Sequence, residues 1–457
     1  TGCNNTAIGC NALKANTTAG CNVAIGYRPL YSNTTGEFNT ALGADTLLSN
    51  ISGDNNFASG YLALYFNLGG CDNTAIGQSA LMCNTHGGYN VAVGRCALKE
   101  NTTGGGNTAI GYLPLCVNTT GSCNTAIGNE ALRFNTTGGH NFAAGSLAMY
   151  ANTTGGCNIA LGKRALQNNI SGCNNAAIGQ YALQNSLSGC HNFAAGCYAL
   201  NSNWGGCHNA AIGESALCKN TTGVNNVAIG CKVLASNTTG GKNIGIGTHA
   251  LDQNTTGNDN FAVGFYAATY NTTGIHNTGL GRYSLRTNST GSYNFAAGFC
   301  SNFCATSGEN NISIGRQSLV GGHGSSGSCN IALGPESLKC NATGNSNTAI
   351  GAYALLSNTT GGCNIAIGCR ALQSSLSGDH NFAAGQCALY SNWGGCCNTA
   401  IGYLALRDNT TGYWNNAFGP YALKSNTTGS DNNAMGFQAL GLNTTGVSNN
   451  AFGRYAL

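Results

Sequence analysis

The sequence predicts an all-β fold, a β-solenoid (β-roll) of 27 coils, and three observations carry that prediction. A glycine returns every 17 residues from Gly9 to Gly315 and again from Gly334 to Gly453, with one longer interval between the two series. An asparagine stands four residues before each of these anchor glycines, from Asn5 onward. The period is about half that of the helical repeats, which need roughly 33 residues or more. We therefore expect one coil of β-structure per repeat.

The repeat reads Asn-Thr-Ala-Ile-Gly-x-x-Ala-Leu-x-x-Asn-Thr-Thr-Gly-x-x, and it predicts two short strands per coil. The strand candidates are Thr-Ala-Ile and x-Ala-Leu-x, and the glycines and Asn-Thr-Thr-Gly predict the turns between them. Equivalent strands of successive coils would stack parallel and in register, about 4.8 Å apart. Residues 1–457 are predicted to form a single continuous β-solenoid, with a two-residue insertion near residues 320–328. Because neither end carries a polar cap, we expect a segment of a longer rod.

Composition excludes several classes of protein. Charged residues are only 7% of the chain, far fewer than in ordinary soluble domains, whereas 42% of residues are hydrophobic, too many for a disordered chain. The net charge of +4 comes without a Lys/Arg cluster, so we expect no nucleic-acid partner. No apolar run approaches the roughly 20 residues of a membrane span. No cofactor motif stands out, and no cofactor is expected.

Two strand positions vary together. Phe replaces the strand Thr in six copies, and in each of them the Ile two residues later is replaced by Ser, Ala or Val. These strands begin at Phe57, Phe142, Phe193, Phe261, Phe295 and Phe382. Alternate strand residues share a face, and paired volume changes indicate that they fill one packed space. We predict that this face is the interior, together with the Leu four residues after each anchor glycine.

The alanine between these two positions is then predicted to point outward. It is Ala in 24 of 27 copies, with Gly245, Gly279 and Ser313 as the exceptions. A solvated position would vary more, so a column that is always small predicts close contact with another chain or with another layer of the same coil. Burial of about three apolar side chains per coil is small beside the conformational entropy of its backbone. A homo-oligomer or an end-to-end filament of this chain is therefore expected.

The repeat resembles those of two related groups of proteins. Asn107 to Leu115 and Asn398 to Leu406 match the Asn-Thr-Ala-Ile-Gly-Tyr-x-Ala-Leu-x-x-Asn-Thr-Thr-Gly repeat of phage and virus tail-fibre-like proteins. The Asn-x-x-Ala-Ile-Gly core is also similar to the head repeat of trimeric autotransporter adhesins, whose repeats are shorter. The resemblance covers the whole chain. It implies a β-roll, often a homotrimer, that serves as a surface shaft or an adhesive head.

Asn-x-Ser/Thr sequons occupy the second turn of most copies and make N-glycosylation a candidate modification, so that the chain would be a glycoprotein. The candidates are Asn16, Asn33, Asn101, Asn118, Asn135, Asn152, Asn220, Asn237, Asn254, Asn271, Asn358, Asn409, Asn426 and Asn443. Turn chemistry is the alternative, since Asn adopts unusual backbone conformations and caps its own turn. The Asn persists where the sequon is lost, as at Asn67, Asn84, Asn203 and Asn392, so it has a structural task in any case.

The 24 cysteines are more than a reducing compartment favours, and they predict an extracellular or virion/cell-surface location with some disulfides. Equivalent positions of stacked coils are spaced suitably for such bonds. The candidates are Cys3 with Cys21, the run Cys157, Cys173, Cys190 and Cys207, and Cys116 with Cys123, which would close a turn.

Cys190, His191, Cys207 and His208 are weak metal candidates, because Cys and His bind zinc and these residues recur on adjacent coils. Consecutive strand residues diverge, so a polar turn ladder is the favoured interpretation, and no metal site is predicted. The His and acidic residues are scattered over edge positions, without paired carboxylates or a Ser/His/Asp arrangement. The chain is therefore not expected to be an enzyme.

Two classes of function remain open. A structural fibre or filament agrees best with a uniform repeat, whereas an adhesin recognising cell-surface glycans would use exposed aromatic residues such as Trp204, Trp393 and Trp414. An ice-binding solenoid needs a regular Thr array, and the replacement of the strand Thr by Phe, Val, Ile or Ala argues against it.

Overall fold

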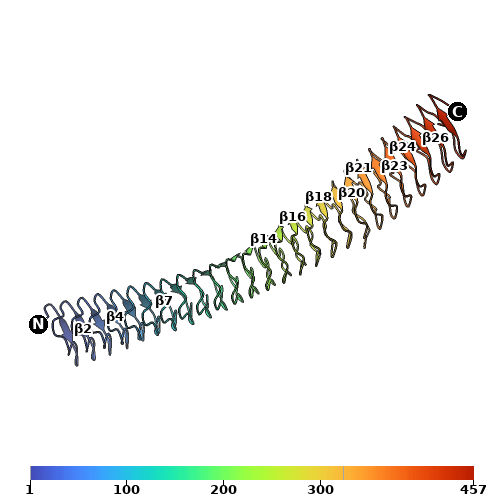
Figure 1. The fold of residues 1–457 in the computed structure, drawn as a ribbon. Coiled ribbons are helices and arrows are strands. Elements are labelled where there is room, and N and C mark those ends of the chain that lie inside the picture. The colour runs from blue at the N-terminus through green and yellow to red at the C-terminus, as the bar shows by residue number, and fades with distance from the viewer. Residues whose placement is uncertain (1, 323) are drawn as a thin grey trace. The chain divides into compact units, whose positions relative to one another are not determined.

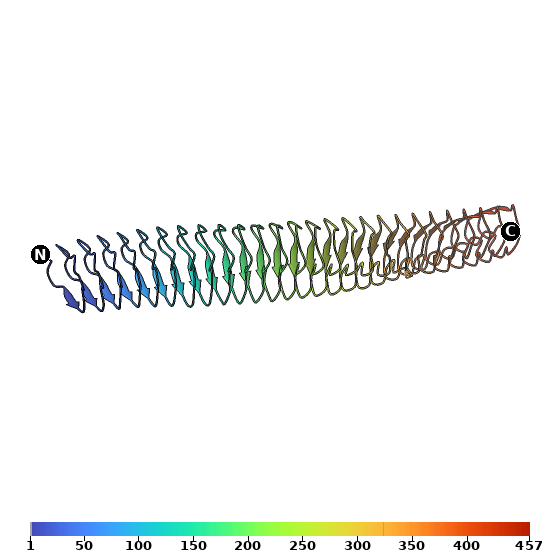
Figure 2. The same ribbon diagram turned by 90° about the horizontal axis from the view of Figure 1, so that it is seen from below.

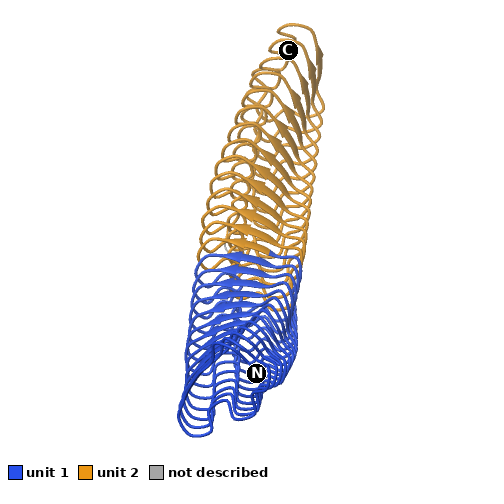
Figure 3. Ribbon diagram, turned by 90° about the vertical axis from the view of Figure 1, so that its left-hand side faces the viewer, with its two compact units in different colours: residues 1–226 blue, residues 227–457 orange. Residues whose placement is uncertain are grey.

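The computed structural model describes residues 2–322 and 324–457 and confirms an all-β, parallel β-solenoid with a 17-residue spacing; no helix occurs in these ranges. The chain divides into two compact units, unit 1 with residues 1–226 and unit 2 with residues 227–457 (Figure 3). The same repeat builds both units. That they form one continuous solenoid stays a prediction.

Each coil contributes one strand of three residues, and within each unit the strands lie side by side in one row (Figure 1, Figure 2). Unit 1 holds β1 (Thr6–Ile8), β2 (Val23–Ile25), β3 (Thr40–Leu42), β4 (Phe57–Ser59), β5 (Thr74–Ile76), β6 (Val91–Val93), β7 (Thr108–Ile110), β8 (Thr125–Ile127), β9 (Phe142–Ala144), β10 (Ile159–Leu161), β11 (Ala176–Ile178), β12 (Phe193–Ala195) and β13 (Ala210–Ile212). Unit 2 holds β14 (Val227–Ile229), β15 (Ile244–Ile246), β16 (Phe261–Val263), β17 (Thr278–Leu280), β18 (Phe295–Ala297), β19 (Ile312–Ile314), β20 (Ile331–Leu333), β21 (Thr348–Ile350), β22 (Ile365–Ile367), β23 (Phe382–Ala384), β24 (Thr399–Ile401), β25 (Asn416–Phe418), β26 (Asn433–Met435) and β27 (Asn450–Phe452).

Neighbouring strands pair parallel and in register, so each repeat position stacks on its equivalent one coil later; Ala126 of β8, for example, pairs with Ala143 of β9. We call the stacked positions columns. The threonine/phenylalanine, alanine and isoleucine columns lie three, two and one residues before the anchor glycine, and the leucine column lies four residues after it. The first asparagine column lies four residues before the anchor glycine, and the second lies seven residues after it.

The second predicted strand, x-Ala-Leu-x, is wrong, because this segment is a turn. Its leucine has a left-handed backbone, with φ of 51° at Leu98 and 49° at Leu200, and the residue two positions earlier is left-handed too, as at Cys96. Ala97 and Leu98 are both fully buried, although successive strand residues would point to opposite faces. Backbone bonds still tie the turn to the next coil, since the Leu98 N–H donates to the Pro114 carbonyl at 3.1 Å.

The leucine column is buried as predicted, but the two faces of the strand are the reverse of the prediction. The alanine column points into the coil, where Ala126 and Ala143 have no exposed surface. In the threonine/phenylalanine column Phe142 is 39% exposed and Phe193 40%, and in the isoleucine column Ile127 is 40% exposed. The strand alanine and the Ala-Leu pair of the opposite turn fill the interior. The paired volume changes therefore lie on the outer surface.

The exceptions in the alanine column show how little room the interior leaves. Gly245 lies beside Val233, which replaces an alanine of the turn, and a Cβ on Gly245 would come within 2.5 Å of Val233 Cγ1. Ser313 instead satisfies its hydroxyl by hydrogen bonds with Ser318, at 2.9 Å, and with Ser301. Of the two explanations for an always-small column, contact with another layer of the same coil is the one that holds.

The first asparagine column is a buried ladder that joins each coil to the next. Asn124 Nδ2 donates to the Gly138 carbonyl at 2.9 Å, and Asn124 Oδ1 accepts the backbone N–H of Asn141 at 3.0 Å. Gly138 closes the repeat that Asn124 opens, and Asn141 begins the next one. One side chain thus satisfies polar backbone groups that burial would otherwise leave unpaired, which explains the Asn in each repeat.

The second asparagine column forms another ladder, made by the asparagines of the sequons. Asn118 Nδ2 donates to Asn101 Oδ1 at 2.8 Å and to the Gly121 carbonyl at 2.9 Å, and Asn118 Oδ1 accepts a bond from Asn135 Nδ2 at 2.8 Å. The donation to Gly121 closes the Asn-Thr-Thr-Gly turn, and the other two bonds connect three successive coils.

The two-residue insertion is absorbed in a turn of unit 2. β19 and β20 on either side of it still pair in register, Ile312 with Ile331. Gly321 and Gly324 adopt left-handed backbone conformations, with φ of 69° and 83°. The extra residues therefore leave the stacking of the strands unchanged.

Replacing Ala126 with glutamine is expected to lower the free energy of unfolding by about 2–5 kcal/mol, because the larger side chain overfills the interior and buries an amide. Urea unfolding followed by circular dichroism measures the change. Asn129→Gln, at an exposed position of the same coil, is the control and should change stability by less than about 0.5 kcal/mol. Equal stability of the two variants would contradict an inward alanine column.

Candidate functional site: the outer face of the sheet

The outer face of the sheet, formed in each unit by the threonine/phenylalanine and isoleucine columns, is the surface best suited to a function. Its side chains are half-exposed or exposed, and β1–β27 contain no charged residue. Apolar side chains such as Phe142, Phe193 and Ile127 recur on it from coil to coil. Scattered exposed apolar residues are ordinary, whereas a contiguous uncharged stripe marks an interaction surface.

The outer face changes character at β25–β27, where asparagines occupy the threonine/phenylalanine column. Asn416 Nδ2 donates to Asn433 Oδ1 at 2.8 Å, and Asn433 Nδ2 donates to Asn450 Oδ1 at 2.9 Å. In β25–β27 the larger side chains, Phe418, Met435 and Phe452, stand in the isoleucine column. Together with the asparagines they line a shallow hollow of about 360 Å³. The hollow is part of the outer face rather than a separate enclosed site.

The structure corrects the glycosylation candidates. Asn33, Asn101, Asn118, Asn135, Asn152, Asn220, Asn237, Asn254, Asn271, Asn358, Asn409 and Asn426 have no exposed surface. A glycan would be joined to the Nδ2 atom, and at Asn118 both hydrogens of that atom are used inside the coil. N-glycosylation of these residues is incompatible with the folded coil. Asn16 and Asn443, near the two ends, are only partly buried.

Among the disulfide candidates, Cys173 and Cys190 come closest to a bond. No disulfide is formed among the cysteines of the described residues, and the Sγ atoms of Cys173 and Cys190 lie 3.0 Å apart. The Cys173 N–H donates to Cys190 Sγ at 3.1 Å, and the Cys190 N–H donates to Cys207 Sγ at 3.3 Å. The thiols thus form a ladder along unit 1. Cys157 is exposed at the neighbouring repeat position.

The other two candidate pairs are arranged differently. Cys3 and Cys21 are both exposed, and the Cys21 N–H donates to the Cys3 carbonyl at 2.9 Å. Cys116 is buried whereas Cys123 is exposed. Burial raises the pKa of the Cys116 thiol to about 11, and the neighbouring Cys96 adds to the shift. Since the thiolate is the reactive form, Cys116 is a poor partner for exchange at neutral pH.

Mild oxidation is expected to join Cys173 to Cys190, which are 17 residues apart in the sequence. The bond should stabilise unit 1 by up to about 3 kcal/mol, because it closes the loop between these residues in the unfolded chain and lowers the entropy of that chain. Peptide mapping by mass spectrometry after treatment with copper-phenanthroline identifies the bond, and thermal unfolding measures its effect. Cys173→Ser is the control and should abolish both. A map that joins Cys190 only to Cys207 would contradict the prediction.

The weak metal candidates do not converge. The rings of His191 and His208 are exposed and stack at 4.9 Å with an interplanar angle of 2°, whereas Cys190 and Cys207 take part in the thiol ladder. Over residues 2–322 and 324–457, no group of three or more His, Cys, Asp or Glu side chains is placed to hold a metal ion. The arrangement is the polar turn ladder that the spacing favours.

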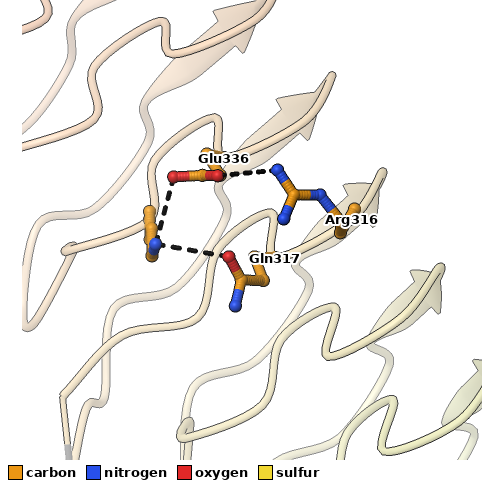
Figure 4. A network of polar contacts seen from close by, with 4 residues as sticks. Arg316, Gln317 and Glu336 are labelled. Carbon is orange, nitrogen blue, oxygen red and sulfur yellow. Dashed lines mark hydrogen bonds and ion pairs between the residues drawn. The ribbon is translucent and has the colours of Figure 1, made fainter.

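Charged and aromatic side chains occupy the edges of the coil. In unit 2, Glu336 accepts bonds from Arg316 at 2.9 Å and from Lys339 at 3.0 Å, and Lys339 also donates to Gln317 at 3.3 Å (Figure 4). This network joins the coils on either side of the insertion. Such exposed pairs contribute little to stability, typically below about 1 kcal/mol each.

The three tryptophans are exposed but lie outside the strands. Trp204, Trp393 and Trp414 are each 57% or 58% exposed. Trp204 and Trp393 directly follow an asparagine of the second asparagine column and precede Gly-Gly. They occupy equivalent positions in the two units, so each unit presents an aromatic ring on a turn.

Comparison with known proteins does not assign the chain to a family. No family model matches it, and no curated protein matches it. In the described part of the chain, no helix has the length and apolar character needed to cross a bilayer.

Sequence reasoning missed two features of the site: the exposure of the paired columns and the burial of the second asparagine column. A signal for the burial was present, because Asn67, Asn84 and Asn203 keep the asparagine after the sequon is lost. The ladder that explains this retention runs through them; Asn84 Nδ2, for example, donates to Asn67 Oδ1 at 2.8 Å. No comparable signal in the sequence distinguishes the outer face from the inner one.

Proposed function

We propose that the chain is a structural protein, a subunit of a fibre or filament that forms an extracellular or virion-surface rod. The observation that carries this proposal is the repetition of the same contacts in each coil: an Ala/Leu interior and two buried asparagine ladders. A coil bonded in this way stacks on the next without changing its structure, so length can grow by adding coils. The role is mechanical rather than catalytic.

Two further features support a rod that works outside the cell in association with its own copies. The outer face is uncharged and apolar in both units, which suits contact between proteins better than contact with water. The 24 cysteines suit an oxidising environment, where Cys173 and Cys190 of the thiol ladder would form a disulfide.

Electron microscopy of the purified full chain tests this function. We expect fibres of uniform width at high protein concentration, with fibre diffraction showing a spacing of about 4.8 Å along the axis from the stacked strands. Compact particles that never assemble, at any concentration, would overturn the proposal.

A glycan-binding adhesin is a second candidate, favoured by the exposed rings of Trp204 and Trp393. A flat aromatic ring offers an apolar face to a sugar. A glycan array probed with the full chain tests this role. Binding that is lost in Trp204→Ala/Trp393→Ala would support it, and the absence of binding to any glycan would exclude it.

A further inference from the structure

We propose that two copies of this chain pack together through the outer face of the sheet, parallel and in register, with the threonine/phenylalanine column of one copy opposite the isoleucine column of the other. This pairing rests on the proposed fibre function and specifies the contact between its subunits. It is carried by the paired volume changes, which the structure places on an exposed surface.

The smallest side chains of the isoleucine column occur beside Phe, whereas other strands carry Ile at both positions, as at Ile365 and Ile367, or Ala before Ile, as at Ala176 and Ile178. Ala or Ser occupies the isoleucine column only in strands that begin with Phe, at Ser59, Ala144, Ala195, Ala297 and Ala384. Conversely, Phe or Met occupies that column only in strands that begin with the smaller Asn, at Phe418, Met435 and Phe452. A surface that faces water has no reason to place its smallest side chains beside its largest ones, whereas a packed one does.

Contacts within one chain do not explain this pairing. Side chains of adjacent coils lie about 4.8 Å apart, whereas alternate residues of one strand lie about 6.6 Å apart. Compensation within the chain would therefore act mainly between coils. Phe142 nevertheless stacks between Thr125 and Ile159, and the small Ala144 stacks between Ile127 and Leu161. In this strand the large and the small side chain are matched to each other and not to the side chains of the neighbouring strands.

The geometry of pairing explains why the balance lies within a strand. In a parallel pair related by a twofold axis along the stack of strands, the two columns of one copy face the exchanged columns of the other at the same level. Phe142 then meets Ala144 of the second copy, and the partner's pair repeats this contact. In an antiparallel pair each column would face the same column of the other copy, but at a different coil. A Phe would then no longer meet the small side chain of its own strand's counterpart.

The size and chemistry of the face are sufficient for a stable interface. Thirteen strands in unit 1 make a face about 62 Å long and 10 Å wide, or about 600 Å² per copy. Unit 2 offers a similar area, and each face by itself reaches the lower end of the range for specific interfaces, about 600 Å² per partner. No charged side chain of β1–β27 would be buried by the contact, so no ion would lose its hydration.

Photo-crosslinking tests the arrangement of the columns. Phe142 is replaced by p-benzoylphenylalanine in the full chain, and ¹⁵N-labelled and unlabelled copies are mixed before irradiation. We expect mixed-isotope cross-links to the peptide that contains Ala144. Cross-links to the Phe column at another level would indicate antiparallel pairing and overturn the proposal, as would the absence of any cross-link between copies.

Compensating substitutions provide a second test. Ser59→Ile, Ala144→Ile and Ala195→Ile together break the balance in three strands of unit 1, and we expect them to weaken self-association at least about tenfold in analytical ultracentrifugation. Adding Phe57→Thr, Phe142→Thr and Phe193→Thr restores the common Thr/Ile pair and should restore association. The melting temperature of the dissociated chain should stay the same throughout, because Ile is the usual residue of this exposed column.

The outcomes separate this inference from the proposed function. Association that is unaffected by the unbalanced variant, or not rescued by the compensated one, overturns the face-to-face pairing while a fibre formed by other contacts remains. At protein concentrations too low for fibres to form, a particle mass other than twice that of the chain overturns the twofold pair. A chain that stays monomeric, leaving the face free for a glycan or lipid, overturns the pairing together with the fibre.

Discussion

Replacing Leu200 with aspartate is expected to unfold the coils around it, with a loss of at least about 4 kcal/mol in the free energy of unfolding. Leu200 has no exposed surface, and its neighbours in the leucine column, Leu183 and Leu217, are buried as fully. The substitution removes an apolar side chain from the interior and places there a carboxylate without a partner. Urea unfolding followed by circular dichroism measures the loss.

Two variants serve as controls for this substitution. Leu200→Met should cost less than about 1.5 kcal/mol, because Met149 already occupies the leucine column and is fully buried. Ser202→Asp introduces the same acid two residues away, at a repeat position where Glu100 and Asp408 occur in other coils, and it should be nearly neutral. A loss in Ser202→Asp as large as that in Leu200→Asp would contradict the assignment of Leu200 to the interior.

The deficit of Leu200→Asp should also depend on pH. Burial disfavours the charged carboxylate and raises its pKa in the folded chain above about 3.9, the value for an unfolded chain. The folded variant then binds more protons than the unfolded one, so its stability falls as the pH rises above that value. We expect a smaller deficit at pH 4 than at pH 8, whereas Leu200→Met should show no such dependence.

Replacing Asn118 with aspartate is expected to lower the free energy of unfolding by about 3–5 kcal/mol. Asn118 Nδ2 donates both of its hydrogens, to Asn101 Oδ1 and to the Gly121 carbonyl, in a position without exposed surface. Aspartate has the same shape but only acceptor oxygens when ionised, so three acceptors would face one another in the interior. Unfolding in urea gives the total loss, and hydrogen exchange of the coils around Asn118 locates it.

Two substitutions calibrate the effect of the aspartate. Asn129→Asp makes the same chemical change at an exposed position of the next coil and should alter stability by less than about 0.5 kcal/mol. Asn118→Ser should fall between the two, since Ser186 and Ser375 occupy the second asparagine column elsewhere in the chain. If Asn118→Asp were as mild as Asn129→Asp, the second asparagine column would not be a buried ladder.

The fold class could be predicted from the sequence because the repeat has a period of 17 residues. A spacing of 17 residues with an Asn and a Gly in each copy leaves room for one β-coil and no helix pair, and it implies the in-register pairing seen between β8 and β9. The burial of Leu98 also follows from its recurrence in a chain with few apolar residues per coil. Local chemistry was less informative, because Ala97-Leu98 suits a strand but forms a turn with a left-handed leucine.

The function of the candidate sites could not be predicted from their sequence motifs. The sequon of Asn118 and the Cys-His pairs at Cys190 and Cys207 are local patterns, and their functional interpretation depends on exposure and direction. Asn118 is buried with both amide hydrogens engaged. The thiols of Cys190 and Cys207 form a ladder while the neighbouring rings stack in solvent. Neither exposure nor direction can be derived from the order of residues alone.

The sequence by itself determined the repeat, the parallel stacking of its coils, and the fact that the two paired columns share one face of the strand. Only the tertiary structure decided on which side of the strand that face lies. Alternate residues of a strand share a face whichever side is buried, so the pattern of Phe142 and Ala144 is the same in either case. The choice depends on the opposite turn, where left-handed backbone turns both Ala97 and Leu98 inward. The remaining width admits only a small side chain, so alanine lies inside, and the paired columns lie outside, where we propose that a second copy packs against them.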